Sequence, residues 1–550
     1  MATITMTGTT GTSPTTMMDP QAECWLAQIP LEILVRITYF ISTPDLGSMR
    51  LSCKALEQRL FNFFSHEFFR KKQFMASSTS MQALIDISKH PTLSPFLKHV
   101  IIGTDRPARY GWSEDRNHVP RAHFEVAVAD HESLLATGGL RDMLAEAFAH
   151  LPNLETVDIR DFNSASRSRD GSGAQWRSYG AGTLATLTNF APNPGPRHDH
   201  DPYATQLFAA VTAALAAAQA RPKSLEVLIR NKQASIFGLL DTAFYISPRM
   251  EPSMVPLLDG LRSLHLTLSL SHPAKPRPFM IQKFLALTPN LTWLRINFNR
   301  TRPDHVTDVL SWLALKENET PAASFDSPPI PLRHLERLDL GGLKINTNTL
   351  LSLVAKLASS LTSLYFRRVV LMPLGGADNT TKVNPWVPCL SAMARIPGVG
   401  LRVVELSQIM HSTNGIWQGP VSFKKGEDAA RLSDTWTCST SVLTLDKALA
   451  QATAEMVATW PPEPDPNAMD GTFERLDACC LVWRVADHVL QRMTRRRTRT
   501  RKKKRKRRRR GKTVKMRMNE SGGELARANL ATRCFGFWGT QRHRLQNGPI

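Results

Sequence analysis

The sequence predicts an α/β protein, a curved row of strand–helix units with parallel strands on the inside and helices on the convex face. Three observations predict it. A six-residue leucine pattern recurs along the chain, helical patterns fill the intervals between its copies, and Gly- and Pro-rich stretches interrupt the series without ending it. We divide the chain into residues 1–22, 23–75, 76–435, 436–491 and 492–550, and take these segments in order.

The first segment, residues 1–22, is rich in Thr, Gly and Ser. We expect it to be disordered because it has little apolar surface to bury. It lacks the basic region and apolar run that mark a signal peptide. The sequence also has no apolar run of about 18 residues, the length that a membrane-spanning helix needs. We therefore expect a cytoplasmic or nuclear protein with no membrane partner.

The second segment, residues 23–75, opens with IPLEILVRITYFISTPDLGSMRLSCK from Ile29 to Lys54, which predicts two short helices around a turn. Pro30 suits a first helical position, and Thr43 suits the cap of the second helix. The first helix has an apolar stripe of Ile33, Leu34, Ile37 and Ile41. So short a unit has little interior, and we expect another protein to cover part of this stripe. The Phe-rich stretch LFNFFSHEFF then predicts a linker helix.

The stretch from Ile29 to Leu56 resembles the F-box, which commonly reads L-P-x-E-I-L, then D-L, then L-R-x-V-C-K-x-W. The matching residues are Ile29, Pro30, Glu32, Ile33, Leu34, Asp45, Leu46, Arg50, Leu51, Cys53 and Lys54, with Ile29 in place of Leu and Leu56 in place of Trp. The resemblance implies a helical unit that docks on the small adaptor protein of cullin-type ubiquitin ligases. The adaptor contacts that it implies are Ile29, Pro30, Ile33, Leu34, Ile37, Leu46 and Leu51. The alternative is an N-terminal helical cap on the strand–helix units.

The third segment, residues 76–435, contains the recurring pattern L-x-x-[LV]-x-[aliphatic or Phe]. Its copies are LKHVII from Leu97, LETVDI from Leu154, LRSLHL from Leu261, LTWLRI from Leu291, LERLDL from Leu335, LTSLYF from Leu361 and LRVVEL from Leu401, with a weaker LEVLIR from Leu225. The end of each copy alternates with period two, which predicts a strand. The intervals are longer and less regular than those of a regular leucine-rich repeat, so we expect an irregular, leucine-rich-repeat-like solenoid. An F-box followed by such repeats resembles fungal F-box substrate receptors.

The alternation of side chains along each strand predicts which residues face outward. Leu294 and Ile296 should point into the core, while Trp293, Arg295 and Asn297 face out. The same register turns outward Thr156, Asp158, Arg160, Ser263, His265, Arg337, Asp339, Tyr365 and Arg367. Trp, Tyr and Arg are the residue types most enriched at interface hot spots. The candidate substrate-binding residues are therefore Trp293, Arg295, Arg337, Tyr365 and Arg367, and the alternative is an ordinary solvated strand face.

The last two segments differ sharply in charge. Residues 436–491 look helical apart from PPEPDPNAMDG, whereas the run from Arg492 to Arg517 holds 18 Lys and Arg and no acidic residue. The rest of the chain carries 51 basic and 47 acidic residues, so most of the net charge of +22 belongs to this tail. We expect residues 492–550 to be mostly disordered because like charges repel. The run suits a nuclear-import signal, a non-specific nucleic-acid or acidic-membrane contact, or an inert tail.

The sequence predicts no catalytic, metal or cofactor site. Its seven cysteines are scattered, without a C-x-x-C pair. RHDHD at Arg197–Asp201 offers His and Asp in a Pro/Gly-rich loop with no further ligand nearby. RGKT at Arg510–Thr513 lacks the first Gly of a phosphate-binding loop, because Lys506 stands there. We therefore expect no enzymatic activity of the chain's own.

These observations favour a substrate-recognition subunit of an F-box ubiquitin ligase, which would bring an unknown protein substrate close to a ubiquitin-loading enzyme. Two alternatives remain open. One is a repeat scaffold that binds a protein partner without any ligase. The other is a nuclear protein that associates with nucleic acid non-specifically through its basic tail.

Overall fold

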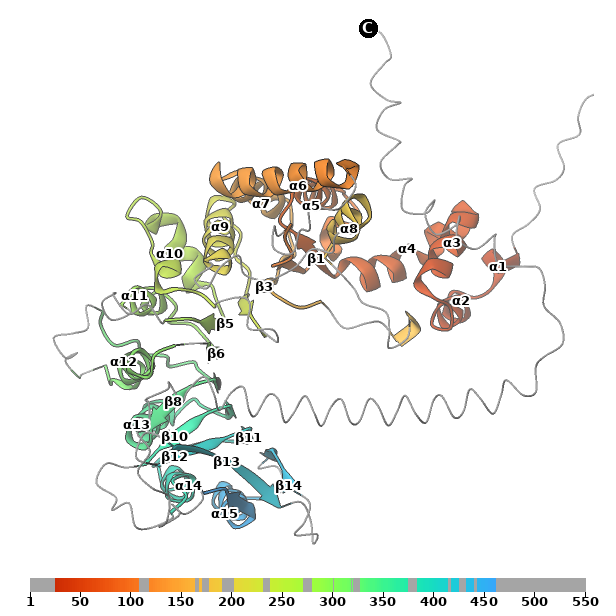
Figure 1. Cartoon of the computed structure of the whole chain (residues 1–550). Coiled ribbons are helices and arrows are strands. Elements are labelled where there is room, and N and C mark those ends of the chain that lie inside the picture. Colours follow the sequence, from red (N-terminus) through yellow and green to blue (C-terminus); the bar gives the residue numbers. More distant parts are fainter. Residues whose placement is uncertain are drawn as a thin grey trace, which may run out of the picture.

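We analysed a computed structural model of the whole chain (Figure 1), which describes residues 25–107, 118–163, 168–170, 178–189, 202–230, 238–270, 279–299, 301–317, 319, 327–373, 383–413, 417–424, 432–439 and 443–460. The fold is mixed α/β, as the sequence predicts, and is dominated by one large, mostly parallel sheet. The expected disorder of residues 1–22 and of the basic tail, and most of the expected C-terminal helical segment, fall outside the described residues.

A small helical unit forms the N-terminal end of the described chain and projects from one end of the sheet (Figure 1). It comprises α1 (Trp25–Gln28), α2 (Leu31–Thr38), α3 (Thr43–Ser52) and α4 (Lys54–Phe69). Pro30 precedes α2 as its N-cap. The predicted cap of α3 is wrong by one residue, because Ser42 occupies the cap position. Its hydroxyl accepts a hydrogen bond from the backbone N–H of Asp45 at 3.3 Å, while Thr43 is already helical.

The large sheet has ten strands in the order β1-β2-β3-β4-β5-β6-β7-β9-β11-β15. They are β1 (Lys71–Met75), β2 (His99–Gly103), β3 (Thr156–Arg160), β4 (Ser224–Leu228), β5 (Ser263–Leu268), β6 (Trp293–Phe298), β7 (Arg337–Gly341), β9 (Ser363–Arg367), β11 (Val403–Ser407) and β15 (Thr435–Ser439). Every pair is parallel except β11 with β15. The predicted parallel pairing of the motif strands in one sheet is therefore confirmed.

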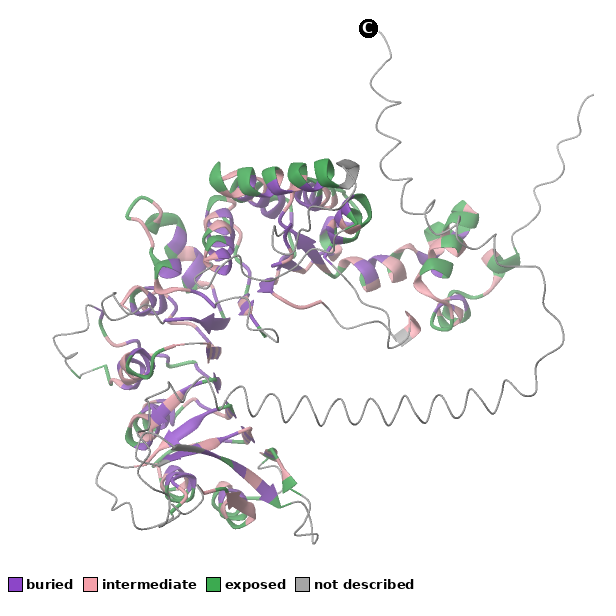
Figure 2. Cartoon of the chain, viewed as in Figure 1, coloured by how far each residue is buried: buried purple, intermediate pink, exposed green. Residues whose placement is uncertain are grey.

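Helices connect the strands and lie along the outer side of the arc, while the strands line the inner side (Figure 1). They are α5 (Ser78–Lys89), α6 (His118–Ala136), α7 (Gly139–Ala149), α8 (Ala181–Thr188), α9 (Tyr203–Ala217), α10 (Glu251–Asp259), α11 (Met280–Ala286), α12 (Pro303–Ala314), α13 (Thr347–Leu357), α14 (Trp386–Ala394) and α15 (Leu445–Glu455), with short 3₁₀ turns η1 (Ser94–Phe96), η2 (Ser168–Asp170) and η3 (Asp241–Phe244). The apolar positions of each leucine pattern face these helices. In the copy of the pattern that contains β6, for example, Leu291, Leu294 and Ile296 are almost fully buried. Figure 2 shows this buried layer running along the sheet.

A second, smaller sheet follows the C-terminal half of the large one. Its order is β14-β13-β12-β10-β8, with β16 paired to β13. The strands are β8 (Lys344–Asn346), β10 (Val370–Met372), β12 (Met410–Thr413), β13 (Trp417–Lys424), β14 (Leu432–Ser433) and β16 (Met456–Ala458). Strands β8, β10 and β12 are parallel and each follows a strand of the large sheet after a short turn. Three successive units therefore contribute a strand to both sheets.

Two predicted segment boundaries need correction. We placed residues 71–75 in the linker, but they form β1, the first strand of the large sheet, in parallel register with β2. We expected residues 436–491 to be helical, but their first residues belong to β15, which closes the sheet antiparallel to β11. Only α15 confirms a helix in this segment, and residues 461–550 lie outside the described part.

Turn η2 links the insertion after β3 to the helical unit. The Asp170 carboxylate accepts hydrogen bonds from the backbone N–H and the hydroxyl of Thr43, at 2.8 and 2.7 Å. The Arg169 guanidinium donates to the backbone carbonyl of Thr38 and to the Glu67 carboxylate, each at 2.6 Å. The insertion therefore touches α2, α3 and α4 at once.

Candidate functional site

The helical unit has a core of its own, which divides its apolar residues into two groups. The core contains Leu34, Leu46, Leu56, Leu60 and Phe68. Leu34 and Leu46, two of the implied adaptor contacts, are fully buried there. Neither exposes side-chain surface in this conformation, and their assignment as adaptor contacts stays a prediction. Their role is to hold α2, α3 and α4 together.

The unit also exposes seven large apolar side chains, on α1, α2, α3 and the turn that follows α2. With their exposed fractions, they are Trp25 77%, Leu26 42%, Leu31 43%, Ile33 49%, Tyr39 59%, Phe40 83% and Leu51 76%. They are seven of the sixteen large hydrophobic side chains that are exposed in the described part of the chain, although the unit is only a small part of it. In Figure 2 much of the ribbon of this unit is coloured as exposed. Such a concentration is typical of an interaction surface. We call these seven residues the apolar patch.

The remaining implied contacts border this patch. Ile33 and Leu51 belong to it, and Pro30 is exposed beside it. Ile29 and Ile37 are half-buried and remain accessible in part. Sequence reasoning missed Leu31, Tyr39 and Phe40, since it followed one stripe of the helix. The run of apolar residues at Tyr39 and Phe40, at the end of α2, was the signal that could have found them.

The five candidate substrate-binding residues lie on the inner face of the sheet, on β6, β7 and β9. Strand β7 lies between β6 and β9, and the register aligns three rows of residues across them, namely Trp293–Arg337–Ser363, Arg295–Asp339–Tyr365 and Asn297–Gly341–Arg367. The predicted alternation of β6 is confirmed, because Leu294 and Ile296 are buried while Trp293, Arg295 and Asn297 are half-exposed. The structure therefore brings all five candidates together on one face.

Three of these residues form a stack across neighbouring strands. The Arg337 guanidinium lies 4.0 Å from the ring centroid of Trp293 and 4.0 Å from that of Tyr365. The ring of His265 continues the stack, since it meets Trp293 edge-on at 4.2 Å. Cation–π contacts of this kind hold both partners in one geometry. We call His265, Trp293, Arg337 and Tyr365 the aromatic–arginine stack.

Asp339 organises the charges beside the stack. Its carboxylate accepts hydrogen bonds from Arg295 Nε and Arg337 Nε, each at 2.8 Å, and from the Trp293 indole N–H at 3.3 Å. Burial alone would lower the pKa of Arg337, but the hydrogen bond and charge of Asp339 outweigh it, so this pKa is raised. Asp339 itself is almost fully buried. Its expected outward orientation is right, but the two arginines cover it.

The first half of the inner face carries a second polar cluster, on β2 to β5. Asp158, Arg160 and His265, which we expected to face solvent, are buried. Arg160 pairs with Asp158, and burial lowers the pKa of Arg160 to about 10. The Glu226 carboxylate has a pKa of about 2, because a hydrogen bond and the charge of His265, together with His99, overcome the effect of its burial. The charges of these groups compensate one another across β2 to β5, although Asp158 Oδ1 and Arg160 Nε are buried without a hydrogen bond to the described residues.

His99 belongs to the same cluster and is neutral. Its Nε2 lies 3.4 Å from Asp158 Oδ2, a geometry that would suit an ion pair. Burial, followed by the charge of Lys71, nevertheless lowers the pKa of His99 to about 3. Because Arg160 already neutralises Asp158, the contact of His99 is one between an uncharged ring and a paired carboxylate.

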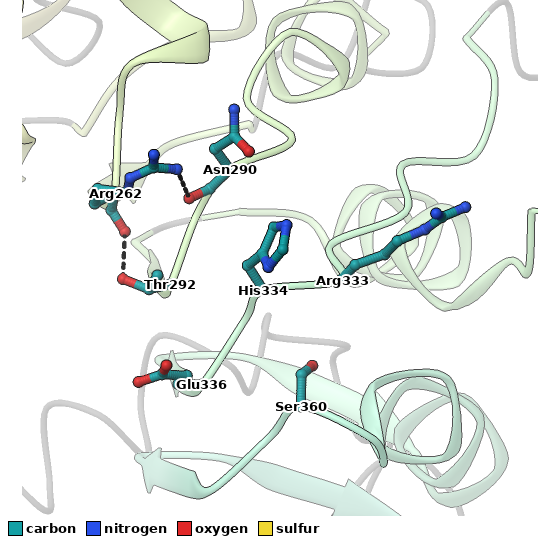
Figure 3. Close-up of a pocket in the computed structure, with 7 residues that line it drawn as sticks. All are labelled: Arg262, Asn290, Thr292, Arg333, His334, Glu336 and Ser360. Carbon is teal, nitrogen blue, oxygen red and sulfur yellow. Dashed lines mark hydrogen bonds between the residues drawn. The ribbon is translucent and has the colours of Figure 1, made fainter.

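A pocket of about 420 Å³ lies at the opposite edge of the sheet, where β5, β6, β7 and β9 begin. It is lined by Arg262, Asn290, Thr292, Arg333, His334, Glu336 and Ser360. Figure 3 shows Arg262 donating to the carbonyl of Asn290, and Thr292 to the carbonyl of Arg262, each at 3.0 Å. Arg333 extends away from them and pairs with Glu317. These polar groups join one unit to the next, and they do not converge on a ligand.

Metal ligands, membrane-spanning helices and similarity to known proteins do not identify a function for this chain. Within the described ranges, His, Cys, Asp and Glu side chains nowhere gather in a group that could hold a metal ion, and RHDHD lies outside these ranges. The helices of the described part include none with the length and apolar character to cross a membrane. The chain matches no protein-family profile and no curated protein.

Proposed function

We propose that this chain is the substrate-recognition subunit of a cullin-type F-box ubiquitin ligase. The N-terminal helical unit would dock on the adaptor, and the inner face of a leucine-rich-repeat-like solenoid would hold the substrate. The chain would supply no catalysis, and the gain in rate would come from proximity. The observation that carries the proposal is the apolar patch, which the unit exposes although it buries a core of its own.

The patch supports docking on a protein for an energetic reason. Burying a large apolar side chain on association contributes about 1.5–3 kcal/mol, and Phe40 and Leu51 are both more than three-quarters exposed. Leaving such side chains in water has no benefit for folding. The positions Pro30, Ile33 and Leu51 also fall where the F-box resemblance implies adaptor contacts. Geometry and resemblance therefore point to the same surface.

Co-purification with the adaptor tests the proposal. The double variant Ile33→Asp, Leu51→Asp places two carboxylates in the apolar patch, and burying each unpaired charge would cost several kcal/mol. We expect the adaptor to be lost. Leu34 is unsuitable for this test because its replacement would disrupt the core.

A matched control uses exposed apolar residues of other helices. Val126 on α6 is 68% exposed and Leu187 on α8 is 52% exposed. The variant Val126→Asp, Leu187→Asp should keep the adaptor. If the patch variant is folded by circular dichroism and still co-purifies with the adaptor, the proposed docking is wrong, and a ligase-independent scaffold becomes the better account.

A further inference from the structure

Arg367 ends β9 on the inner face, one row beyond Glu405 of β11, which is in register with Tyr365. Its guanidinium is exposed, and among the described residues no hydrogen bond or ion pair engages it. Its neighbours in register, Gly341 on β7 and Ser407 on β11, are uncharged. A single exposed arginine is ordinary, so the surroundings decide whether this one forms part of a site.

Gly341 of β7 lies between Asn297 of β6 and Arg367 of β9 and has no side chain to fill the space between them. A Cβ built on Gly341 would lie 2.1 Å from Oδ1 of Asn297, so the amide of Asn297 occupies the space above the glycine. Glycine inside a strand often marks the close approach of another group. The Asn297 amide is a donor as well as an acceptor, and it makes no hydrogen bond to the described residues. Asn297 lies in the same row as Arg367, with Gly341 of β7 between them.

Two more guanidiniums share this end of the sheet. Arg230 follows β4 and is exposed, with its guanidinium 3.6 Å from the ring centroid of Phe162. Burial, and then the positive charges of Arg367 and Arg295, lower the pKa of Arg230, while Asp161 opposes them. Arg295 must share the carboxylate of Asp339 with Arg337. This end of the inner face therefore has guanidiniums that repel one another and too few carboxylates to match them.

We propose that Arg230, Arg367 and Asn297 form a binding site for an acidic side chain, a carboxylate or a phosphate, of an extended protein segment that lies on the aromatic–arginine stack. This rests on the proposed function, and it names the chemical class of the substrate. Arg367 and Asn297 donate hydrogen bonds to the anion, and Arg230 adds charge from the same end of β4, which β5, β6 and β7 separate from β9. Charge-assisted hydrogen bonds of this kind are the strong ones.

The charges of the chain favour a separate protein as the occupant. The chain's own C-terminal tail is strongly basic, and a cationic site repels it. A single-stranded nucleic acid is anionic, but it needs free aromatic faces on which bases can stack. Arg337 already covers one face of Trp293 and one face of Tyr365. An acidic peptide needs no free ring face and fits the site better.

An array of short peptides of random sequence, probed with the full-length chain, tests the proposal. Each peptide is made with a rising number of acidic side chains, once as glutamate and once as phosphoserine. We expect binding to rise with acidic content, and the two forms show which anion is preferred. The variant Arg230→Ala, Arg367→Ala should weaken binding of the best peptide about 100-fold, because the charged hydrogen bond of Arg367 and the charge of Arg230 are each worth about tenfold.

The matched control removes the same charge at the other end of the strands. Arg221 and Arg402 are exposed and precede β4 and β11, and the variant Arg221→Ala, Arg402→Ala should bind the peptide unchanged. The tail is present in every variant, so its attraction for acidic peptides cancels.

Three results would overturn the inference. They are an affinity that does not rise with acidic content, an affinity for the best peptide that is the same in Arg230→Ala, Arg367→Ala as in Arg221→Ala, Arg402→Ala, and random single-stranded DNA that binds through Arg230 and Arg367 more tightly than any peptide. The array needs no adaptor. If Arg230 and Arg367 prove not to matter for acidic peptides while the adaptor still binds, the anion site is wrong and the proposed ligase role is unaffected. Loss of the adaptor with acidic preference intact removes the proposed ligase role alone.

Discussion

Replacing Asp339 with Ala should destabilise the sheet far more than the loss of an ordinary surface carboxylate. The side chain is 8% exposed, and it accepts hydrogen bonds from Arg295, Arg337 and Trp293. Breaking a buried charge pair costs about 3–5 kcal/mol. The two guanidiniums are about a third exposed, so water replaces part of what they lose. We expect the free energy of unfolding to fall by about 2–3 kcal/mol, after this discount for solvent.

Urea unfolding followed by circular dichroism measures this loss. Asp339→Asn keeps the volume and one acceptor, and it should cost less than Asp339→Ala. Glu317→Ala is the matched control, because Glu317 also pairs with an arginine, Arg333, but in full contact with solvent. It should leave the unfolding curve unchanged. If Asp339→Ala and Glu317→Ala unfold alike, the arginines are independently solvated and the stack is not held by Asp339.

Three further outcomes follow from the structure. Leu34→Ala removes a fully buried side chain and should lower the free energy of unfolding of the helical unit by about 2–5 kcal/mol. Limited proteolysis should then cut α2 and α3 first. The control Ile33→Ala, at an exposed position, should resist proteolysis as well as the parent chain does. The pKa of His99 in the folded chain is about 3, below the 6.5 of an ordinary histidine. Between pH 6.5 and pH 3 the unfolded state therefore binds more protons than the folded state, so the stability of the parent chain falls with falling pH. Thermal melts should show a shallower fall over this range in His99→Gln. Deleting residues 492–517 should leave adaptor binding intact, exclude a fluorescent fusion from the nucleus, and abolish any DNA binding that weakens steeply with salt.

The sequence predicted the sheet well because its signal is repeated. Each motif strand places leucine or another apolar residue at the same three positions, and burial under the helices requires them there. Strand β1, KKQFM, was missed because it has no leucine pattern and begins with two lysines. Strands β8 and β10 have three residues each, too few for a period to emerge. A strand's pairing partner is also a property of the fold, and β15 shows this by running antiparallel.

The candidate surfaces were predicted less completely, for a related reason. Periodicity gives the face of a residue but not what covers it. Asp158 and Arg160 face the predicted way, yet they neutralise each other and are buried. In α2, Leu34 is buried and its neighbour Ile33 is exposed, and only the packing of α4 decides between them. Arg230 was missed because it lies just beyond the strand, outside the alternating register.

The hydrogen bonds between η2 and the helical unit affect how firmly the unit is held relative to the sheet. If the chain contributes only proximity, then the position of the inner face relative to the docked unit determines the gain. A unit joined to the sheet through α4 alone would be free to swing about the short connection between α4 and β1. Asp170 fixes the start of α3, and Arg169 fixes the end of α2 and the Glu67 side chain of α4. Because these contacts lie on three helices, they restrict rotation as well as separation. The insertion after β3, which interrupts the repeating pattern in the sequence, thus supplies the second attachment that a positioning scaffold requires.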